Sequence, residues 1–267
     1  MSWALLHRRP KLAPGDVRAG IARHSIRETP PLATELSYLA AGDPSGRRVV
    51  LIHGSPSQAE DWLPFLRSVP AGQQWLAPDR PGFGCSGPSD VPIDLGVQAA
   101  ALHPLLSATA AGKAILVGRS MGAPIAVRAA LDFPDLTGGV LLIGGALSAE
   151  LERVHWLQRV AARPMIAGLL PRAIRNSNRE LLALKGQLAD LAPRLGSLRT
   201  RVTVVHGTAD PLVPYANVAF LERALAGSGT LTVVTVPGGD HFLDDRHDAV
   251  IRDALQALVA AADRDGG

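Results

Sequence analysis

Short apolar runs alternate along this chain with longer stretches in which apolar residues recur every three or four positions. The runs are rich in valine, isoleucine and leucine, and each has the length of a β-strand. We predict eight strands, at 23–29, 35–41, 47–52, 74–77, 114–117, 139–143, 202–205 and 231–236. Because most of these runs are apolar at nearly every position, they indicate a mostly parallel sheet that is buried on both faces.

The stretches between the strands predict helices that cover the two faces of the sheet. Helical periodicity is found at 61–69, 95–108, 121–132, 215–226 and 247–261. The first two strands differ from the rest, because only a short proline-containing segment separates them, and they predict a hairpin at one edge. The order of elements is that of an α/β fold.

One segment, residues 147–199, interrupts this alternation. Trp156 and Val160 lie at helical spacing, and the prolines and the glycine that follow predict short, broken helices. The segment holds nine Lys or Arg residues and four acidic ones, a basic balance that fits either an anionic substrate or a solvated surface. We predict a helical cap at 147–199, inserted between the two parts of one core, 1–146 and 200–267.

The composition is that of a globular protein. Apolar residues make up 47% of the 267 positions and charged residues 19%. The net charge of +3 is small and the basic residues are scattered, so we expect no nucleic-acid partner. Cys85 is the only cysteine, which excludes an internal disulfide and fits a reducing compartment.

Membrane insertion and secretion are not indicated by the sequence. No apolar segment reaches the roughly 18 to 20 residues that a spanning helix needs. In the N-terminal stretch the apolar run 3–6 precedes the basic residues, which is the reverse of the order in a secretory signal. We therefore predict a soluble, cytoplasmic protein.

The most informative motif is Gly118-Arg119-Ser120-Met121-Gly122, between a predicted buried strand and a predicted helix. A sharp turn at such a place can project a serine above the sheet, and the two glycines let strand and helix approach closely. Serine alone is a poor nucleophile at neutral pH, so a base must take its proton and a third group must orient that base. Ser120 is the candidate nucleophile.

Candidates for the base and the acid follow two later strands. Asp210 comes after the strand that ends at 205, and His241 comes after the strand that ends at 236. Asp240 is a rival acid, but neighbours in sequence rarely meet in the geometry that a catalytic triad needs. We therefore favour Asp210 as the acid and His241 as the base, which gives the order serine, aspartate, histidine.

With these motifs the chain resembles the α/β-hydrolase family over nearly its whole length. The HGSP motif at 53–56 is similar to the family's oxyanion loop, and DRPGFGCS at 79–86 is similar to its D-x-x-G-x-G-x-S loop. Ser120, Asp210 and His241 match its triad. The resemblance implies an α/β-hydrolase fold, with a mostly parallel eight-stranded sheet, helices on both faces and a small helical cap.

Acyl transfer creates a negatively charged oxygen, which two well-aimed backbone N–H groups can stabilise. We expect those of Ser55 and Met121 to serve. The expected function is a serine hydrolase that cleaves a carboxylic ester or thioester of a small molecule through an acyl-enzyme, with no metal and no organic cofactor. We expect Trp156, Val160 and Leu169 of the cap to face the substrate and to set acyl selectivity.

Other functions remain open at this point. The same triad serves carbon–carbon bond hydrolysis, aminopeptidase action and cofactor-free perhydrolysis, which differ in the pocket. A noncatalytic ligand receptor of the same fold is the alternative from another class, and the intact triad argues against it. The oligomeric state is open too.

Two further residue patterns need an interpretation. The glycines at 82–87 also fit a dinucleotide-binding loop, but Pro88 and Pro92 disturb the helix that should follow, and no acid lies at 102–107. Arg119, inside the serine motif, can contact substrate or form a structural salt bridge, and both roles remain open.

Overall fold

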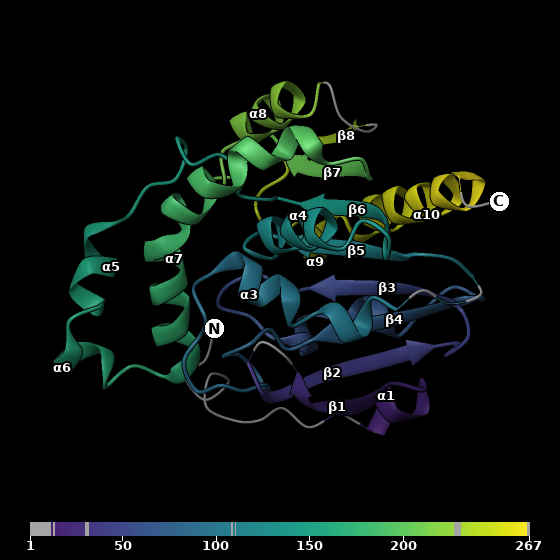
Figure 1. Cartoon of the computed structure of the whole chain (residues 1–267), viewed down its shortest axis with the longest axis horizontal. Helices are drawn as coiled ribbons and strands as arrows, with labels where there is room; N and C mark the ends of the chain where they lie inside the picture. Colours follow the sequence, from purple (N-terminus) through teal and green to yellow (C-terminus); the bar gives the residue numbers. More distant parts are fainter. Residues whose placement is uncertain are drawn as a thin grey trace.

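One eight-stranded sheet with helices on both faces organises this chain in the computed structural model, shown in Figure 1. The structure describes residue 12 and residues 14–29, 32–107, 109, 111–226 and 231–265. The apolar run at 3–6 and the two prolines at 30–31 lie outside the described residues.

All eight predicted strands are confirmed, with small differences at their ends. They are β1 (Ala22–Thr29), β2 (Thr34–Gly42), β3 (Arg47–Ile52), β4 (Gln73–Pro78), β5 (Ala114–Arg119), β6 (Thr137–Ile143), β7 (Arg201–Gly207) and β8 (Leu231–Val236). Their order across the sheet is β1-β2-β4-β3-β5-β6-β7-β8. The pairs β1–β2 and β2–β4 are antiparallel and the other pairs are parallel, so the predicted hairpin forms one edge.

Alternate residues of the central strands enter two separate cores. In β3, Val50 and Ile52 pack into the core on one face of the sheet. Val49 and Leu51 pack into the core on the other face, and all four side chains are fully buried. Because successive side chains of a strand point to opposite faces, apolar residues at every position require cover on both sides.

Helices supply this cover. The first core is covered by α3 (Leu95–Ala100), α4 (Gly122–Asp132) and α8 (Ala216–Ala224), and the second by α2 (Leu63–Leu66) and α10 (Asp248–Asp265). Two short helices, α1 (Pro14–Arg18) and α9 (Leu243–Arg246), precede β1 and α10 along the chain, and Leu243 of α9 packs into the second core. α3 is shorter than predicted and is followed by a 3-10 turn, His103–Leu105, because Pro104 lacks the N–H that a continuing α-helix needs.

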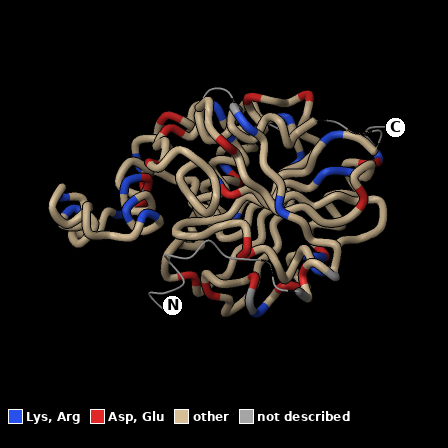
Figure 2. Tube along the Cα trace, turned by 90° about the horizontal axis from the view of Figure 1, so that it is seen from below, with Lys and Arg blue, Asp and Glu red and all other residues tan. Residues whose placement is uncertain are grey.

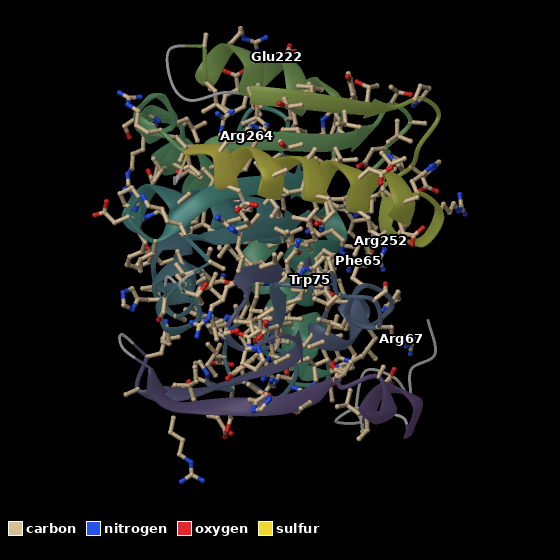
Figure 3. All side chains as sticks on the ribbon, turned by 90° about the vertical axis from the view of Figure 1, so that its right-hand side faces the viewer. Phe65, Arg67, Trp75, Glu222, Arg252 and Arg264 are labelled. Atoms are coloured by element: carbon tan, nitrogen blue, oxygen red, sulfur yellow. The ribbon has the colours of Figure 1, made fainter. Side chains whose placement is uncertain are left out.

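The long C-terminal helix α10 is anchored by one arginine, as Figure 3 shows for Arg252, Phe65 and Trp75. The guanidinium carbon of Arg252 lies 4.5 Å from the ring centroid of Phe65 and 5.9 Å from that of Trp75. Its Nη2 also donates to the carbonyl of Pro64 at 2.8 Å. The cation over the ring fixes α10 against α2.

The insertion between β6 and β7 forms α5 (Trp156–Ala161), α6 (Pro164–Ala167) and α7 (Arg172–Leu191), followed by a 3-10 turn (Ala192–Ser197). The prediction of short helices is wrong for α7, which runs for 20 residues. Leu184, Leu188 and Leu191 recur at helical spacing and are buried in the first core. This tertiary contact stabilises α7 over its full length, and the helix contains no proline that would interrupt it.

Helices α5 and α6 project away from the sheet in Figure 1, and α7 leads back toward it. Figure 2 shows Lys and Arg along this projecting part. Trp156 and Leu169, expected to face the substrate, are 63% and 84% exposed, so neither is packed into a closed pocket in this structure. Val160 is half-buried. No described helix combines the length and the hydrophobicity that crossing a bilayer requires.

Candidate active site

Ser120 occupies the tight turn between β5 and α4. Its φ is +51°, a left-handed conformation that residues other than glycine rarely adopt. The flanking glycines are required: a Cβ on Gly118 would lie 2.5 Å from the carbonyl oxygen of Gly122, and one on Gly122 would lie 2.3 Å from that of Ile52. The turn is therefore strained and closely packed, and it presents Ser120 at the end of β5.

His241 follows β8 and bridges the two other candidates. Its Nδ1 lies 2.7 Å from Asp210 Oδ2, and its Nε2 lies 3.1 Å from Ser120 Oγ. The strands β5, β7 and β8 run parallel, so the residues that follow them meet at one edge of the sheet. The structure thus brings together the serine, the histidine and the aspartate selected from the sequence.

Asp210 is buried and held in one orientation. Its Oδ1 accepts the backbone N–H of Val213 at 2.8 Å. Burial favours the neutral acid, but the nearby His206 and His241 rings and the N–H of Val213 outweigh it and hold the pKa of Asp210 well below its ordinary value. His206 Nε2 is closer to the carbonyl of Val213, at 2.9 Å, than to Asp210 Oδ2, at 3.6 Å. The ionised carboxylate favours a proton on Nδ1 of His241, which leaves Nε2 free to accept one.

The rival acid, Asp240, has other partners. Its Oδ1 accepts the N–H of Phe242 at 2.9 Å, and its Oδ2 pairs with Arg246 at 2.8 Å. The side chains of Asp240 and Arg246 are 31% and 70% exposed. Asp240 therefore belongs to a surface ion pair, and the contact with Nδ1 of His241 is made by Asp210.

The loop after β3 lies against this turn. A Cβ on Gly54 would lie 3.2 Å from Cβ of Ser120, so Ser55 and Met121 are the residues adjacent to this close contact. Their backbone N–H groups are the candidate donors to an oxyanion. In addition, the hydroxyl of Ser55 is buried without a hydrogen-bond partner among the described residues.

Gly144, just after β6, lies against the side chains of Asp210 and His241, although it was not predicted from the sequence. A Cβ there would lie 3.4 Å from Asp210 Oδ2 and 3.5 Å from His241 Nδ1, and its φ is +51°. The available signal was a Gly-Gly pair directly after a buried strand. The two separations would be ordinary van der Waals distances, so the left-handed φ, and not a lack of space, favours glycine at position 144.

Arg119 forms a cluster of ion pairs beside the turn. It pairs with Asp244, and with Asp61 at 3.2 Å. Its Nη2 also donates to Ser57 Oγ at 3.2 Å, and its guanidinium lies 5.8 Å from the ring of Trp62. Of the two roles left open by the sequence, these contacts favour the structural one.

The loop at 79–86 braces the chain. Asp79 is fully buried; its Oδ1 accepts the N–H of Ala59 at 2.8 Å, and its Oδ2 accepts that of Cys85 at 2.9 Å. No helix begins directly after this loop, because α3 starts only at Leu95, and this disfavours a dinucleotide site. Within the described residues, no group of three or more His, Cys, Asp or Glu side chains is placed to hold a metal ion.

The chain has recognisable relatives among known proteins. Residues 49–254 match the alpha/beta hydrolase family. A 2-hydroxy-6-oxo-6-phenylhexa-2,4-dienoate hydrolase of Burkholderia cepacia is 31% identical over 209 residues, which cover 63% of this chain and 73% of that protein. A 2-(acetamidomethylene)succinate hydrolase of Mesorhizobium japonicum is 26% identical, with 81% of this chain and 89% of that protein covered.

Solved structures show the same fold. A 2-hydroxy-6-oxo-6-phenylhexa-2,4-dienoate hydrolase of a Rhodococcus species superposes with a TM-score of 0.71 at 21% identity, over 89% of this chain and 98% of that one. An E-2-(acetamidomethylene)succinate hydrolase gives a TM-score of 0.66 at 21% identity, over 90% and 99% of the two chains.

Proposed function

This chain belongs to the alpha/beta hydrolase family, and from that premise we propose that it is a serine hydrolase of a small molecule. Ser120 is the nucleophile, His241 the base and then the acid, and Asp210 orients His241. The observation that carries the proposal is the continuous path from Asp210 Oδ2 through His241 to Ser120 Oγ, with separations of 2.7 and 3.1 Å.

The reaction begins when Ser120 Oγ attacks a carbonyl carbon and its proton passes to Nε2 of His241. The carbonyl oxygen becomes negative, and the N–H groups of Ser55 and Met121 stabilise it. The tetrahedral intermediate then expels the leaving group, which takes the proton from His241. A water molecule, deprotonated by the same histidine, releases the acid and restores Ser120.

The bond that is cleaved is a second part of the proposal. From the sequence alone we expected an ester or thioester. The compound named in the Burkholderia relative, 2-hydroxy-6-oxo-6-phenylhexa-2,4-dienoate, contains no ester or amide, so its hydrolysis requires cleavage of a carbon–carbon bond beside the oxo carbon. The carbon that leaves must then take up a proton. This relative favours a carbon–carbon bond for the present chain, with the ester or thioester second.

The size and charge of the substrate are proposed from the same relatives. The dienoate carries one carboxylate, and the succinate named in the Mesorhizobium protein carries two. We infer a small substrate that bears a carboxylate. We propose that the segment 147–199 is a cap over the candidate site. It joins β6 to β7, and the residues that follow these two strands include Gly144 and Asp210.

A fluorophosphonate probe followed by a substrate panel tests this function. The probe should modify Ser120 in the wild type, as found by intact mass and peptide mapping, and should not modify Ser120→Ala. The panel compares a 2-hydroxy-6-oxo dienoate, a short aryl ester and a thioester. Turnover that is lost in Ser120→Ala supports the proposal. Binding of these compounds with neither labelling nor turnover would instead indicate a receptor.

A further inference from the structure

A buried arginine outside the triad holds the loop that carries Ser55. Arg80 is 0% exposed and its partner Glu180 is 1% exposed. A guanidinium has five N–H groups, and each of those on Arg80 has an acceptor. Nε donates to His53 O at 3.0 Å, Nη1 to Gln98 Oε1 at 2.6 Å and to Glu180 Oε2 at 2.8 Å, and Nη2 to Gly54 O and Glu180 Oε1, both at 2.8 Å.

The side chain of His53 makes a second hydrogen bond to the carbonyl of Gly54, which Arg80 also contacts. The backbone N–H of Arg80 donates to His53 Nε2 at 2.9 Å, so the proton of the neutral ring lies on Nδ1. Nδ1 is 2.8 Å from Gly54 O and donates to it. Burial, and then the charge of Arg80, hold the pKa of His53 well below its ordinary value, which keeps the ring in this neutral form.

The orientation of Gly54 O determines that of the next N–H group. Gly54 O and Ser55 N–H belong to one peptide unit, which is trans. In a planar trans peptide the C=O and N–H bonds point in opposite directions. Two hydrogen bonds to Gly54 O therefore fix the direction of the Ser55 N–H. A cationic donor on the carbonyl also polarises the peptide and strengthens its N–H as a donor.

Glu180 adds a connection to the insertion. It lies in α7, 100 positions after Arg80, and binds the guanidinium through both carboxylate oxygens. A paired carboxylate keeps the buried Arg80 charge compensated and its plane fixed. The path from α7 to the Ser55 peptide thus consists of two residues, Glu180 and Arg80.

We propose that Arg80 is a positioning residue, which aims and polarises the Ser55 N–H for the oxyanion, and that Glu180 links α7 to this donor. The kinetic part of this inference rests on the proposed serine-hydrolase function. The orientation of the Gly54–Ser55 peptide is independent of it.

The first test separates positioning from simple stabilisation. The variants are Arg80→Lys and Glu180→Gln, and the control is Arg47→Lys. Arg47 is also a buried ion-paired arginine, and it begins the strand that leads to this loop. Each variant is assayed for kcat and KM per fluorophosphonate-reactive site, and for inhibition by a trifluoromethyl ketone, which forms a tetrahedral oxyanion on Ser120.

Arg80→Lys should lower kcat about tenfold to a hundredfold, because the loss of one oxyanion donor costs roughly a hundredfold to a thousandfold. Glu180→Gln keeps one acceptor oxygen for the guanidinium of Arg80. It should lower kcat roughly threefold to tenfold, since it holds Arg80 less firmly against the Gly54 carbonyl but leaves Arg80 in place. KM should change little, and the ketone should bind more weakly by the same factor as kcat falls. Arg47→Lys should lower thermal stability and leave kcat per site unchanged.

The second test needs only folded protein. The amide nitrogen resonance of Ser55 should move in Arg80→Lys and in Glu180→Gln and should stay in place in Arg47→Lys. An unmoved Ser55 resonance, or a kcat per site equal to that of the wild type, would show that Arg80 and Glu180 form a structural pair only. If Arg80→Lys does not fold, Glu180→Gln decides both tests. If wild-type Ser120 takes no probe while the Ser55 resonance moves, the serine-hydrolase proposal fails and the positioning of the peptide is supported.

Discussion

Nδ1 of His241 lies 2.7 Å from Asp210 Oδ2 across 31 positions of the chain, whereas the adjacent Asp240 pairs with Arg246. Asp210→Asn should therefore lower turnover by about a thousandfold or more, because an amide neither stabilises the imidazolium nor fixes the histidine tautomer. Asp240→Asn removes only a surface ion pair and should leave kcat close to the wild-type value. Steady-state kinetics on both variants checks the ranking, and the reverse ranking would identify Asp240 as the acid.

Gly144→Ala should reduce kcat because relief of the backbone strain at a φ of +51° would shift a residue that lies against the candidate triad. The new methyl group would itself be in ordinary contact, 3.4 Å from Asp210 Oδ2 and 3.5 Å from His241 Nδ1, so a shift of the strained backbone would carry it into them. A small displacement of catalytic groups costs on the order of a hundredfold. Gly20→Ala is the matched control, because Gly20 also has a positive φ and an added Cβ there meets nothing within 4 Å. Both variants should lose about 1–2 kcal/mol of stability from backbone strain. Equal kcat values for the two would rule out a strain-driven displacement of Asp210 or His241.

Arg119→Met should destabilise the fold, because it leaves the buried carboxylate of Asp244 without its cation. We expect a loss of roughly 2–3 kcal/mol in the free energy of unfolding. Adding Asp244→Asn should recover part of this loss, since it removes the uncompensated charge. Chemical denaturation of the single and double variants measures both effects. An Arg119→Met protein of unchanged stability with a raised KM for anionic substrates would favour a substrate-binding role.

His53 should make the protein less stable in mild acid. Burial and the nearby Arg80 hold its pKa well below 6.5, so the folded chain leaves His53 unprotonated while the unfolded chain protonates it. The stabilising contribution is therefore complete above about pH 6.5 and falls by about 1.4 kcal/mol per pH unit below it. In His53→Gln, a neutral amide replaces the titrating ring. Denaturant unfolding of both proteins between about pH 7.5 and 5 should give a flatter dependence for the variant; equal slopes would contradict this account.

The cap hypothesis can be tested at its exposed side chains. Trp156→Ser and Leu169→Ser should change the free energy of unfolding by less than about 0.5 kcal/mol, because both side chains face solvent. If the segment 147–199 covers the substrate during the reaction, these variants should change the ranking of short against longer acyl chains. The rate of Ser120 labelling by a small phosphonate should remain the same. An unchanged acyl ranking would make α5 and α6 a surface element.

The positions of the strands could be predicted because burial on both faces leaves uninterrupted apolar runs, as at Val49–Ile52. The length of α7 could not, because it depends on a tertiary contact: Leu184 and Leu188 pack into a core formed by residues far away in sequence. Local glycine and proline signals describe where helices break, and they carry no information about such contacts.

The candidate site was predictable only where a local motif marks it. Ser120, Asp210 and His241 follow strand ends, and Gly118 and Gly122 mark a close approach of backbone. Arg80 and Glu180 carry no such mark, because the two residues lie 100 positions apart. A single charge on a predicted helix is typically solvated, and only the folded chain shows that Glu180 is buried.

The two edges of the sheet differ in how readily a β-strand of another molecule can pair with them. β1 lies at one edge, and its sequence ARHSIRET contains charged residues that discourage the addition of another strand. β8 lies at the other edge and pairs only with β7 among the strands described; its sequence, LTVVTV, has neither a charge nor a proline. Uncharged β-branched segments of this length stack readily between chains. The strand that leads to His241 is therefore also the point at which heated or partly unfolded molecules can join edge to edge.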